Sequence, residues 1–162
     1  MYITYEEYAQ FYNPIDEKVF NRLCFDASRV MDIHTTGIDN LKKLKRFFPN
    51  DSDAVEAVKR CAAKLIYLMT QIETAEEAAF GAYENSEIGI RGKYIASVSA
   101  GNESISYTSG NDSKTAISEA VADRTKRNNL MAEIVREYLS GVTDANGVNL
   151  LFMGRYPGRY LC

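Results

Sequence analysis

A chain of 162 residues, 46% of them hydrophobic and 25% charged, has the length and balance of one soluble globular domain. Its formal net charge of −3 argues against a protein whose main task is to coat nucleic acid, because that task needs a strong excess of cations. No stretch approaches the roughly 18 apolar residues of a transmembrane helix, and the first residues lack a leader pattern, so we expect a cytoplasmic protein with no membrane partner.

The spacing of apolar residues predicts helices through the first third of the chain. Thr4 and Glu7 have the spacing of a capping box and predict a short helix over 5–11. Apolar positions that recur at three and four predict a second helix from Asp16 to about residue 33. A short amphipathic segment follows at 41–48, and we interpret its four cations as a solvated face. These cations are Lys42, Lys43, Lys45 and Arg46.

Two long helices are predicted further along the chain. The first begins near Asp53, which we expect to act as its cap, continues weakly to about residue 80 and has an acidic distal end. The second covers about 114–139 and has apolar residues at both ends and a polar centre at 124–129. Negative charge at the end of a helix opposes the helix dipole, so a partner or plain solubility is expected to account for the acidic end.

Residues 93–109 differ from the rest of the chain because their side chains alternate with the period of a strand. The step at 100–102 supplies residues that suit a tight turn, which predicts a β-hairpin. The expected fold is therefore mainly α, a small helical bundle of three to four helices with the hairpin inserted between the second and third long helices. We assign residues 1–141 to this helical domain and 142–162 to an apolar C-terminal tail that folds back or docks on a partner.

No residue pattern indicates catalysis. Cys24 and Cys61 fall on apolar helix faces and are expected in the core, and Cys162 is expected to be an exposed thiol. His34 has no second histidine with which to share a metal, and we interpret it as a residue that interacts with a helix C-terminus. The chain has no glycine-rich phosphate loop and no nucleophile motif, so we predict a protein that is not an enzyme and has no cofactor.

Three patterns in the sequence resemble the head-tail connector family of long-tailed bacteriophages and prophages, whose members are also called adaptors or head-completion proteins. The first pattern is 3–8 with 20–23 and 27–28, the second is the hairpin 97–107, and the third is 138–141 with 150–154. The hairpin, Ser-x-Ser-x-Gly-x-x-Ser-x-Ser-Tyr, is the most specific of them. Ala100 and Asn102 depart from the small acidic turn expected there.

The resemblance implies a helical structural protein of the virion neck that is made in the host cytoplasm. Such proteins assemble as a ring, commonly twelvefold, beneath the portal protein. The ring extends the DNA channel, touches DNA only in passing and provides a platform for stopper or tail-completion proteins.

Three sets of residues are candidates for contacts in such an assembly. The hairpin set, expected to contact a neighbouring subunit or line the channel, is Ser97, Ser99, Glu103, Ser104, Ser106 and Tyr107. The charged set pairs Glu73, Glu76 and Glu77 of one subunit with Arg124, Lys126 and Arg127 of its neighbour. The tail set, expected to dock on the portal, is Leu150, Leu151, Phe152, Met153, Arg155 and Tyr156.

The sequence leaves a second class of function open. A small helical regulator that binds nucleic acid would use the cations of 42–46 or those of 124–127, and its affinity would fall steeply with salt. An enzyme of phage DNA metabolism is disfavoured, because no acid, base or metal ligands converge by spacing.

Overall fold

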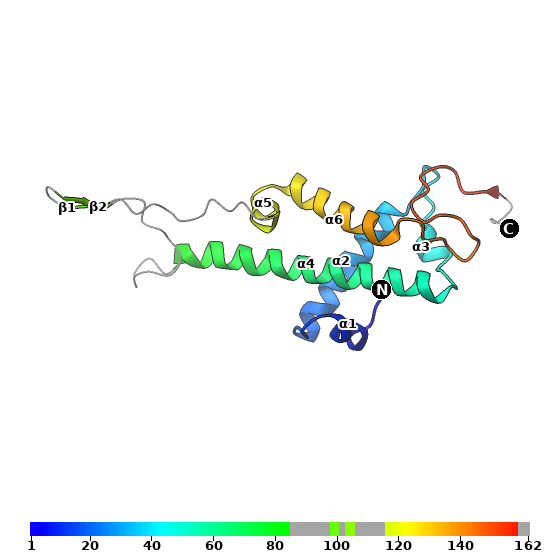
Figure 1. Ribbon diagram of the computed structural model, residues 1–162, viewed down its shortest axis with the longest axis horizontal. Helices are drawn as coiled ribbons and strands as arrows, with labels where there is room; N and C mark the ends of the chain where they lie inside the picture. Colours follow the sequence, from blue (N-terminus) through cyan, green and yellow to red (C-terminus); the bar gives the residue numbers. More distant parts are fainter. Residues whose placement is uncertain (85–97, 101–102, 106–115, 159–162) are drawn as a thin grey trace.

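The fold is organised around one long helix, α4 (Ser52–Glu84), against which four other helices pack. The computed structural model describes residues 1–84, 98–100, 103–105 and 116–158. In Figure 1, α1 lies on one side of α4, and α5 and α6 lie on the other. Among the described residues, no helix has both the length and the apolar run that crossing a membrane requires.

The first two helices begin where the sequence places them. α1 (Tyr5–Phe11) has the predicted capping box, in which Thr4 and Glu7 each accept the other's backbone N–H. α2 (Glu17–His34) is capped by Asp16, whose carboxylate accepts the N–H groups of the second and third helical residues. The expectations for both helices are confirmed.

The cap of α4 is Asp51 and not Asp53. The Asp51 carboxylate accepts hydrogen bonds from the N–H groups of Asp53 at 3.1 Å and of Ala54 at 3.0 Å. Asp53 stands inside the first turn instead, where its negative charge is favourable next to the helix dipole. The prediction of the capping residue was wrong by two positions because both aspartates suit the start of a helix.

The predicted helix over 114–139 is two helices, α5 (Ala116–Ala122) and α6 (Arg124–Leu139). They meet at Asp123, whose backbone is extended and whose carboxylate accepts the N–H of Thr125 at 2.7 Å. A short acidic side chain competes in this way for backbone N–H groups and starts a new helix. Both helices pack on α4 and on each other.

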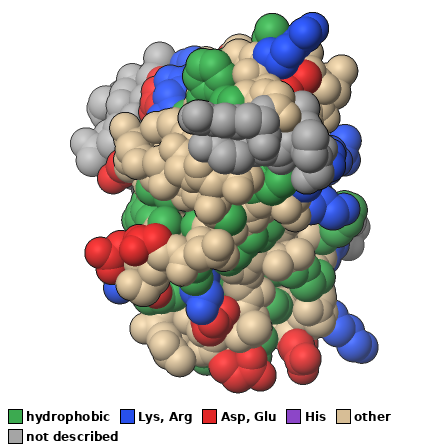
Figure 2. All heavy atoms as spheres, turned by 90° about the vertical axis from the view of Figure 1, so that its right-hand side faces the viewer, with side chains coloured by type: hydrophobic (Ala, Val, Ile, Leu, Met, Phe, Trp, Pro, Cys, Tyr) green, Lys and Arg blue, Asp and Glu red, His purple; other side chains and the backbone are tan. Residues whose placement is uncertain are grey.

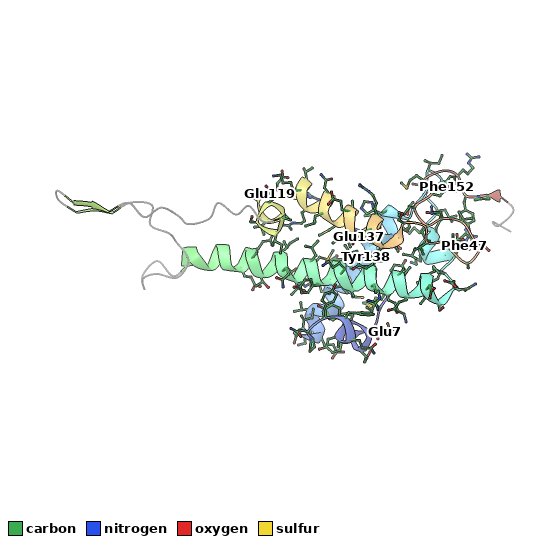
Figure 3. All side chains as sticks on the ribbon, viewed as in Figure 1. Glu7, Phe47, Glu119, Glu137, Tyr138 and Phe152 are labelled. Atoms are coloured by element: carbon green, nitrogen blue, oxygen red, sulfur yellow. The ribbon has the colours of Figure 1, made fainter. Side chains whose placement is uncertain are left out.

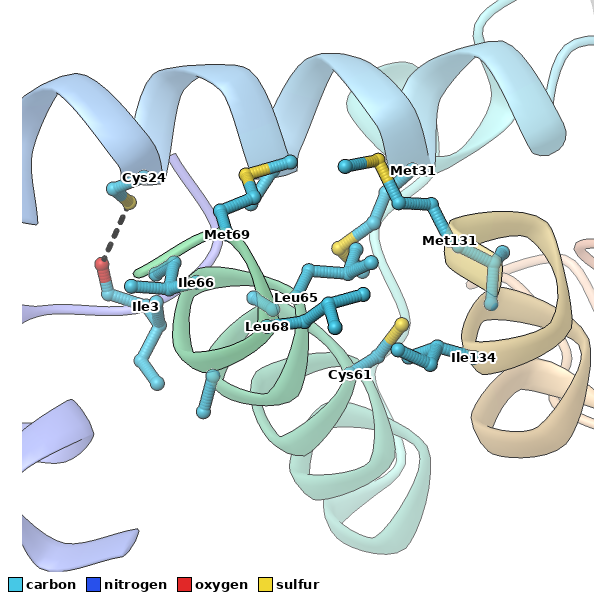
Figure 4. Packing of buried hydrophobic residues seen from close by; sticks show 14 of the residues in the cluster. Ile3, Cys24, Met31, Cys61, Leu65, Ile66, Leu68, Met69, Met131 and Ile134 are labelled. Atoms are coloured by element: carbon cyan, nitrogen blue, oxygen red, sulfur yellow. Dashed lines mark hydrogen bonds between the residues drawn. The ribbon is translucent and has the colours of Figure 1, made fainter. Parts of the chain in front are cut away.

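The core lies where α2, α4 and α6 meet (Figure 4). Cys24 and Cys61 are both fully buried there as free thiols, which confirms the prediction for them. Burial raises the pKa of the Cys61 thiol to about 12. The side chains that surround them include Met31, Leu65, Ile66, Leu68, Met69, Met131 and Ile134.

A second, smaller packing region joins the four-residue helix α3 (Lys43–Arg46) to the C-terminal segment, residues 140–158. The two segments lie side by side at the right-hand end of Figure 1. Leu44 and Leu150 are fully buried and connect this region to the main core.

The predicted bundle of three to four helices with an inserted hairpin is wrong as a description of this fold. The described residues contain six helices, and no strand packs on any of them. The only pairing between strands in the described part joins β1 (Val98–Ala100) to β2 (Glu103–Ile105), with Ser99 opposite Ser104. The other residues of the predicted 93–109 hairpin lie outside the described residues.

Candidate functional site

The C-terminal segment carries the whole predicted tail set and is held against α3 by a buried cation. Lys43 is 1% exposed, and its ammonium donates hydrogen bonds to the carbonyl oxygens of Phe152 and, at 3.4 Å, Asn149. It also lies over the Phe152 ring, 5.7 Å from the centroid. Burial lowers the pKa of Lys43, and attraction to Asp144 and Asp39 partly opposes that shift.

Tyr156 fixes the C-terminal end of this segment. Its hydroxyl donates to Asp144 Oδ2 at 2.6 Å, and its backbone N–H donates to Asp39 Oδ2 at 2.8 Å. The ring stacks on Phe47 with 4.8 Å between centroids. The amide of Asn146 also donates to the Tyr156 hydroxyl, at 3.0 Å. We call Lys43, Asp39, Asp144 and Tyr156 the polar clasp, since together they tie the segment to α3.

The clasp revises two expectations. Lys43 is not part of a solvated face, because its ammonium is bound by two carbonyl oxygens of the folded tail and attracted by the carboxylates of Asp144 and Asp39. The other three cations at 42–46 are exposed. Leu150 and Tyr156 of the tail set are buried in the subunit, so they are not free to dock on a portal while the segment stays folded. Leu151 is half-buried, and Phe152, Met153 and Arg155 are exposed.

Two backbone segments meet at the end of the molecule and present an apolar surface. The N–H of Ile38 donates to the carbonyl oxygen of Met153 at 3.0 Å. Gly37 is buried against Gly154, where a Cβ on Gly37 would stand 2.5 Å from the Gly154 carbonyl oxygen. Three large apolar side chains of these two segments are exposed to solvent. They are Ile38, 75% exposed, Phe152, 46% exposed, and Met153, 54% exposed, and we call them the apolar tip.

Exposed cations stand in and next to α3 and in the C-terminal segment. Lys42, Lys45, Arg46 and Arg155 are exposed and form no ion pair among the described residues. Arg46 is connected to the tail through Phe47, over whose ring its guanidinium lies at 5.4 Å. Figure 2 shows this end of the molecule, with basic side chains mainly along the top and right-hand edges and acidic ones mainly along the left-hand and lower edges.

Most of the charged set that we predicted to pair between subunits is paired within one chain. Glu76 accepts from Arg127, which also donates to the carbonyl oxygen of Ala120 at 3.0 Å. Glu73 forms a two-bond ion pair with Arg22 at 2.5 and 2.8 Å, and this pairing lowers the pKa of Glu73. Lys126 pairs with Glu119 at 3.2 Å. Only Glu77 and Arg124 of this set form no ion pair in the described part of the chain.

Only three of the six residues in the hairpin set lie within the described residues. The structure gives the backbone pairing of Ser99, Glu103 and Ser104, in which Glu103 stands opposite Ala100. Ser97, Ser106 and Tyr107 lie outside the described residues. The predicted contacts of this set therefore remain predictions.

An open pocket of about 540 Å³ lies beside α1. Ile3 and Phe20, both nearly buried, contribute to its lining, and Glu6, Glu17 and Asn21 stand exposed around it. The first residues of the chain are fixed in place. Tyr2 donates to Asp32 through its hydroxyl, and the carbonyl oxygen of Ile3 accepts from Cys24 at 3.7 Å. We call this the N-terminal pocket.

The pocket has an acidic edge. Glu7 pairs with Lys59 at 2.5 Å, but Glu6 and Glu17 form no ion pair among the described residues. Hydrogen bonds from its own backbone N–H and from Thr4 lower the pKa of Glu6, so its carboxylate is charged at neutral pH.

Within the described residues, no three His, Cys, Asp or Glu side chains gather closely enough to hold a metal ion. His34 ends α2, and burial together with the nearby Arg136 lowers its pKa. The sequence patterns predict neither the pocket nor the polar clasp, although one signal is present. Lys43 stands four residues before Phe47, which places it on the apolar face of the short helix.

Comparisons with known proteins found no match for the chain among family models, curated proteins or solved structures.

Proposed function

We propose that this protein is a structural head-tail connector of a tailed phage or prophage. It assembles as a ring on the portal, extends the DNA channel and offers a platform for a stopper or tail-completion protein. The proposal rests on the three sequence patterns described above. It draws its structural support from the apolar tip, which two of the tail-pattern residues, Phe152 and Met153, help to form.

The apolar tip carries the proposal because it is exposed and yet held in place. Solvent-exposed apolar side chains that cluster on a soluble protein usually mark a contact with another molecule. Here the polar clasp fixes the backbone from which they project, so that little conformational entropy is lost when they are covered. A preorganised apolar surface of this kind suits a protein whose work is assembly.

The nucleic-acid regulator is the weaker alternative. Of the four cations at 42–46, Lys43 is withdrawn into the polar clasp, and of those at 124–127, two are engaged in ion pairs within the chain. The few cations of these two groups that remain unpaired and exposed make a small basic surface for a protein that must neutralise several phosphates.

Negative-stain microscopy of the protein mixed with a candidate portal ring tests the proposal. We expect an added ring of density on one end of the portal. The double variant Phe152→Ser/Met153→Ser should lose this density while its circular dichroism stays unchanged, because both side chains are exposed. The matched control is Phe25→Ser, which removes an aromatic side chain that is 62% exposed on α2, away from the tip, and should leave the ring intact.

Portals that stay bare at every concentration of the wild-type protein would count against the connector. Tight, salt-sensitive binding to duplex DNA in the absence of any ring would favour the regulator instead.

A further inference from the structure

The helix α2 is packed on one side only. Figure 3 shows α2 crossing α4, from the side where Glu7 of α1 is labelled to the side where Glu137 of α6 is labelled, and α2 contacts all three helices. Cys24 and Met31 lie on the packed side of α2, next to the core in Figure 4, and both are fully buried. The other side of α2 faces away from the core.

The outer face of α2 carries three residues in one row. Phe25, Arg29 and Ile33 are spaced four residues apart, which places them along one line of the helix, opposite Cys24 and Met31. Phe25 is 62% exposed and Ile33 is 58% exposed. These two apolar side chains stand about 12 Å apart along the helix axis, with Arg29 between them. We call the three residues the α2 row.

The charges next to this row have both signs and are unpaired. Arg29 is exposed, and Arg29, Asp26 and Asp32 form no ion pair among the described residues. The two aspartates stand three residues before and three residues after Arg29, one on each flank of the row. The face therefore has a cation at its centre, a carboxylate on each flank and an apolar side chain at each end.

Neighbours within the chain compensate these aspartates only in part. Asp32 accepts a hydrogen bond from the hydroxyl of Tyr2, which is a neutral donor. Asp26 attracts Arg22, but that guanidinium already forms two hydrogen bonds with Glu73. Both carboxylates thus keep negative charge that a cation from outside the subunit can meet.

We propose that the α2 row is the contact between two copies of this chain, related by a two-fold axis that passes next to Arg29. The two helices run in opposite directions across the contact, so Phe25 of each copy meets Ile33 of the other. Arg29 of each copy lies between Asp26 and Asp32 of the other. The inference does not depend on the proposed function, because a ring is built from heterologous contacts on other surfaces.

A two-fold contact requires a surface that matches its own rotated image, and this face does. The rotation exchanges positions that lie equally far before and after Arg29, so the apolar residue at one end of the row meets the apolar residue at the other end. The two arginines stand at the axis, and their long side chains turn toward the carboxylates on either flank. Opposite charges placed in this way favour one register over others.

The spacing of the row also suits helix packing. Rows of residues four apart form the ridges that interdigitate when two helices cross at about 50°, which is the commonest class of helix contact. One such crossing is a small interface, since stable complexes bury roughly 1,200–2,000 Å² in total. We therefore expect a weak dimer, and sedimentation velocity at increasing protein concentration should show a monomer that converts to a dimer.

Disulfide trapping tests the register of the contact. All variants carry Cys162→Ser, and the two other cysteines of the chain are fully buried. Phe25→Cys mixed with an affinity-tagged Ile33→Cys should give the tagged heterodimer on mild oxidation, and Arg29→Cys alone should give a homodimer. A disulfide forms only when the two Cα atoms come within about 7 Å, and this register brings both pairs that close.

Phe25→Cys alone is the matched control, because the two copies of position 25 lie more than about 10 Å apart in this register. We expect the mixture of Phe25→Cys and Ile33→Cys to give several times more disulfide than the control. Equal yields, or no disulfide from the mixture and from Arg29→Cys, would overturn the inference.

Charge reversal gives an independent readout of the same contact. Arg29→Asp places a carboxylate between the two aspartates of the other copy, and it should raise the dissociation constant of the dimer by about tenfold or more. The further change Asp26→Arg restores opposite charges and should recover most of the affinity. Lys45→Asp makes the same reversal at an exposed position of α3 and should leave the dimer unchanged. If the double variant recovers nothing, the charges do not meet across the contact and the inference is wrong.

Other occupants of this face would give different results. A protein that stays monomeric at high concentration, and whose Phe25→Cys thiol becomes protected from a thiol reagent only on the portal, would assign the face to the portal and overturn the self-contact. A dimer that no portal recruits leaves this inference standing and removes the connector function. Portal rings built from a protein that never dimerises would do the reverse.

Discussion

The hydroxyl of Tyr156 donates a 2.6 Å hydrogen bond to Asp144 Oδ2, and both side chains are at least 95% buried. The other carboxylate oxygen of Asp144 accepts the N–H groups of Asn146 and Val148, which fixes the turn that begins at Asp144. One carboxylate thus joins the turn at the start of the tail to a residue twelve positions later. The stretch between them, which carries Phe152 and Met153, keeps its shape because its two ends are tied to the same group.

Removal of this hydroxyl should destabilise the protein. In Tyr156→Phe, Asp144 Oδ2 loses its donor, and a buried group without a partner costs about 1–3 kcal/mol. We expect a loss of that size in the free energy of unfolding, measured by urea denaturation. Arg155→Ala is the control, since its side chain is exposed, and it should stay within about 0.5 kcal/mol of wild type. A Tyr156→Phe protein as stable as the control would mean that the polar clasp does not hold the tail.

Truncation of two lysines in the same short helix should have very different effects on stability. Lys43→Ala removes the buried ammonium that donates to the carbonyl oxygens of Asn149 and Phe152, and a polar group left without its partner costs about 1–3 kcal/mol. Lys45→Ala removes an exposed cation and should change the stability by less than about 0.5 kcal/mol. Parallel urea titrations check this, and equal midpoints would show that Lys43 is solvated in solution.

How far the sequence predicts this fold depends on the kind of signal. The Thr4 and Glu7 capping box is local, and α1 begins where it requires. Aspartate before a helix is also a local signal, but it is ambiguous when two stand close together, so Asp51 took the cap expected of Asp53. Asp123 falls inside the single helix predicted over about 114–139, because nothing in the apolar spacing marks a break there.

The candidate site was harder to predict because its parts are distant in sequence. Lys43 and Phe152 are 109 positions apart, and Asp39 and Tyr156 are 117 apart. Periodicity describes one helix at a time and does not report which segments meet. The same limit explains the charged set, where the opposite charges were recognised but their pairing within one chain, as between Glu76 and Arg127, was not.

The close approach of Gly37 and Gly154 should make position 37 intolerant of even a methyl group. In Gly37→Ala the new Cβ would stand 2.5 Å from the Gly154 carbonyl oxygen, so one of the two backbone segments has to move. We expect a loss of roughly 1–3 kcal/mol in the free energy of unfolding, the usual cost of overpacking, and faster proteolysis of the tail. Gly158→Ala is the matched control, because a Cβ there meets no atom within 4 Å. If both variants behave alike, the two segments do not touch in solution.

The buried thiol of Cys61 should make the protein less stable at alkaline pH. The unfolded thiol has a pKa near the ordinary 9.0, whereas burial raises the folded pKa to about 12. The unfolded state therefore releases its proton first, and the stability that the neutral thiol provides, complete below pH 9.0, is lost as the pH rises toward 12. At about pH 10.5 this loss is about 2 kcal/mol, at 1.36 kcal/mol for each pH unit above the unfolded pKa.

The measurement compares wild type with Cys61→Ala at about pH 8 and about pH 10.5. Cys61→Ala loses packing at both pH values, but it has no thiol to titrate. Its deficit in unfolding free energy relative to wild type should therefore shrink by about 2 kcal/mol between the two conditions. The groups that titrate in both proteins, such as the half-buried phenol of Tyr12, cancel in this difference. A deficit that stays constant with pH would show that Cys61 reaches solvent in the folded protein, in contradiction to the packing between α2, α4 and α6.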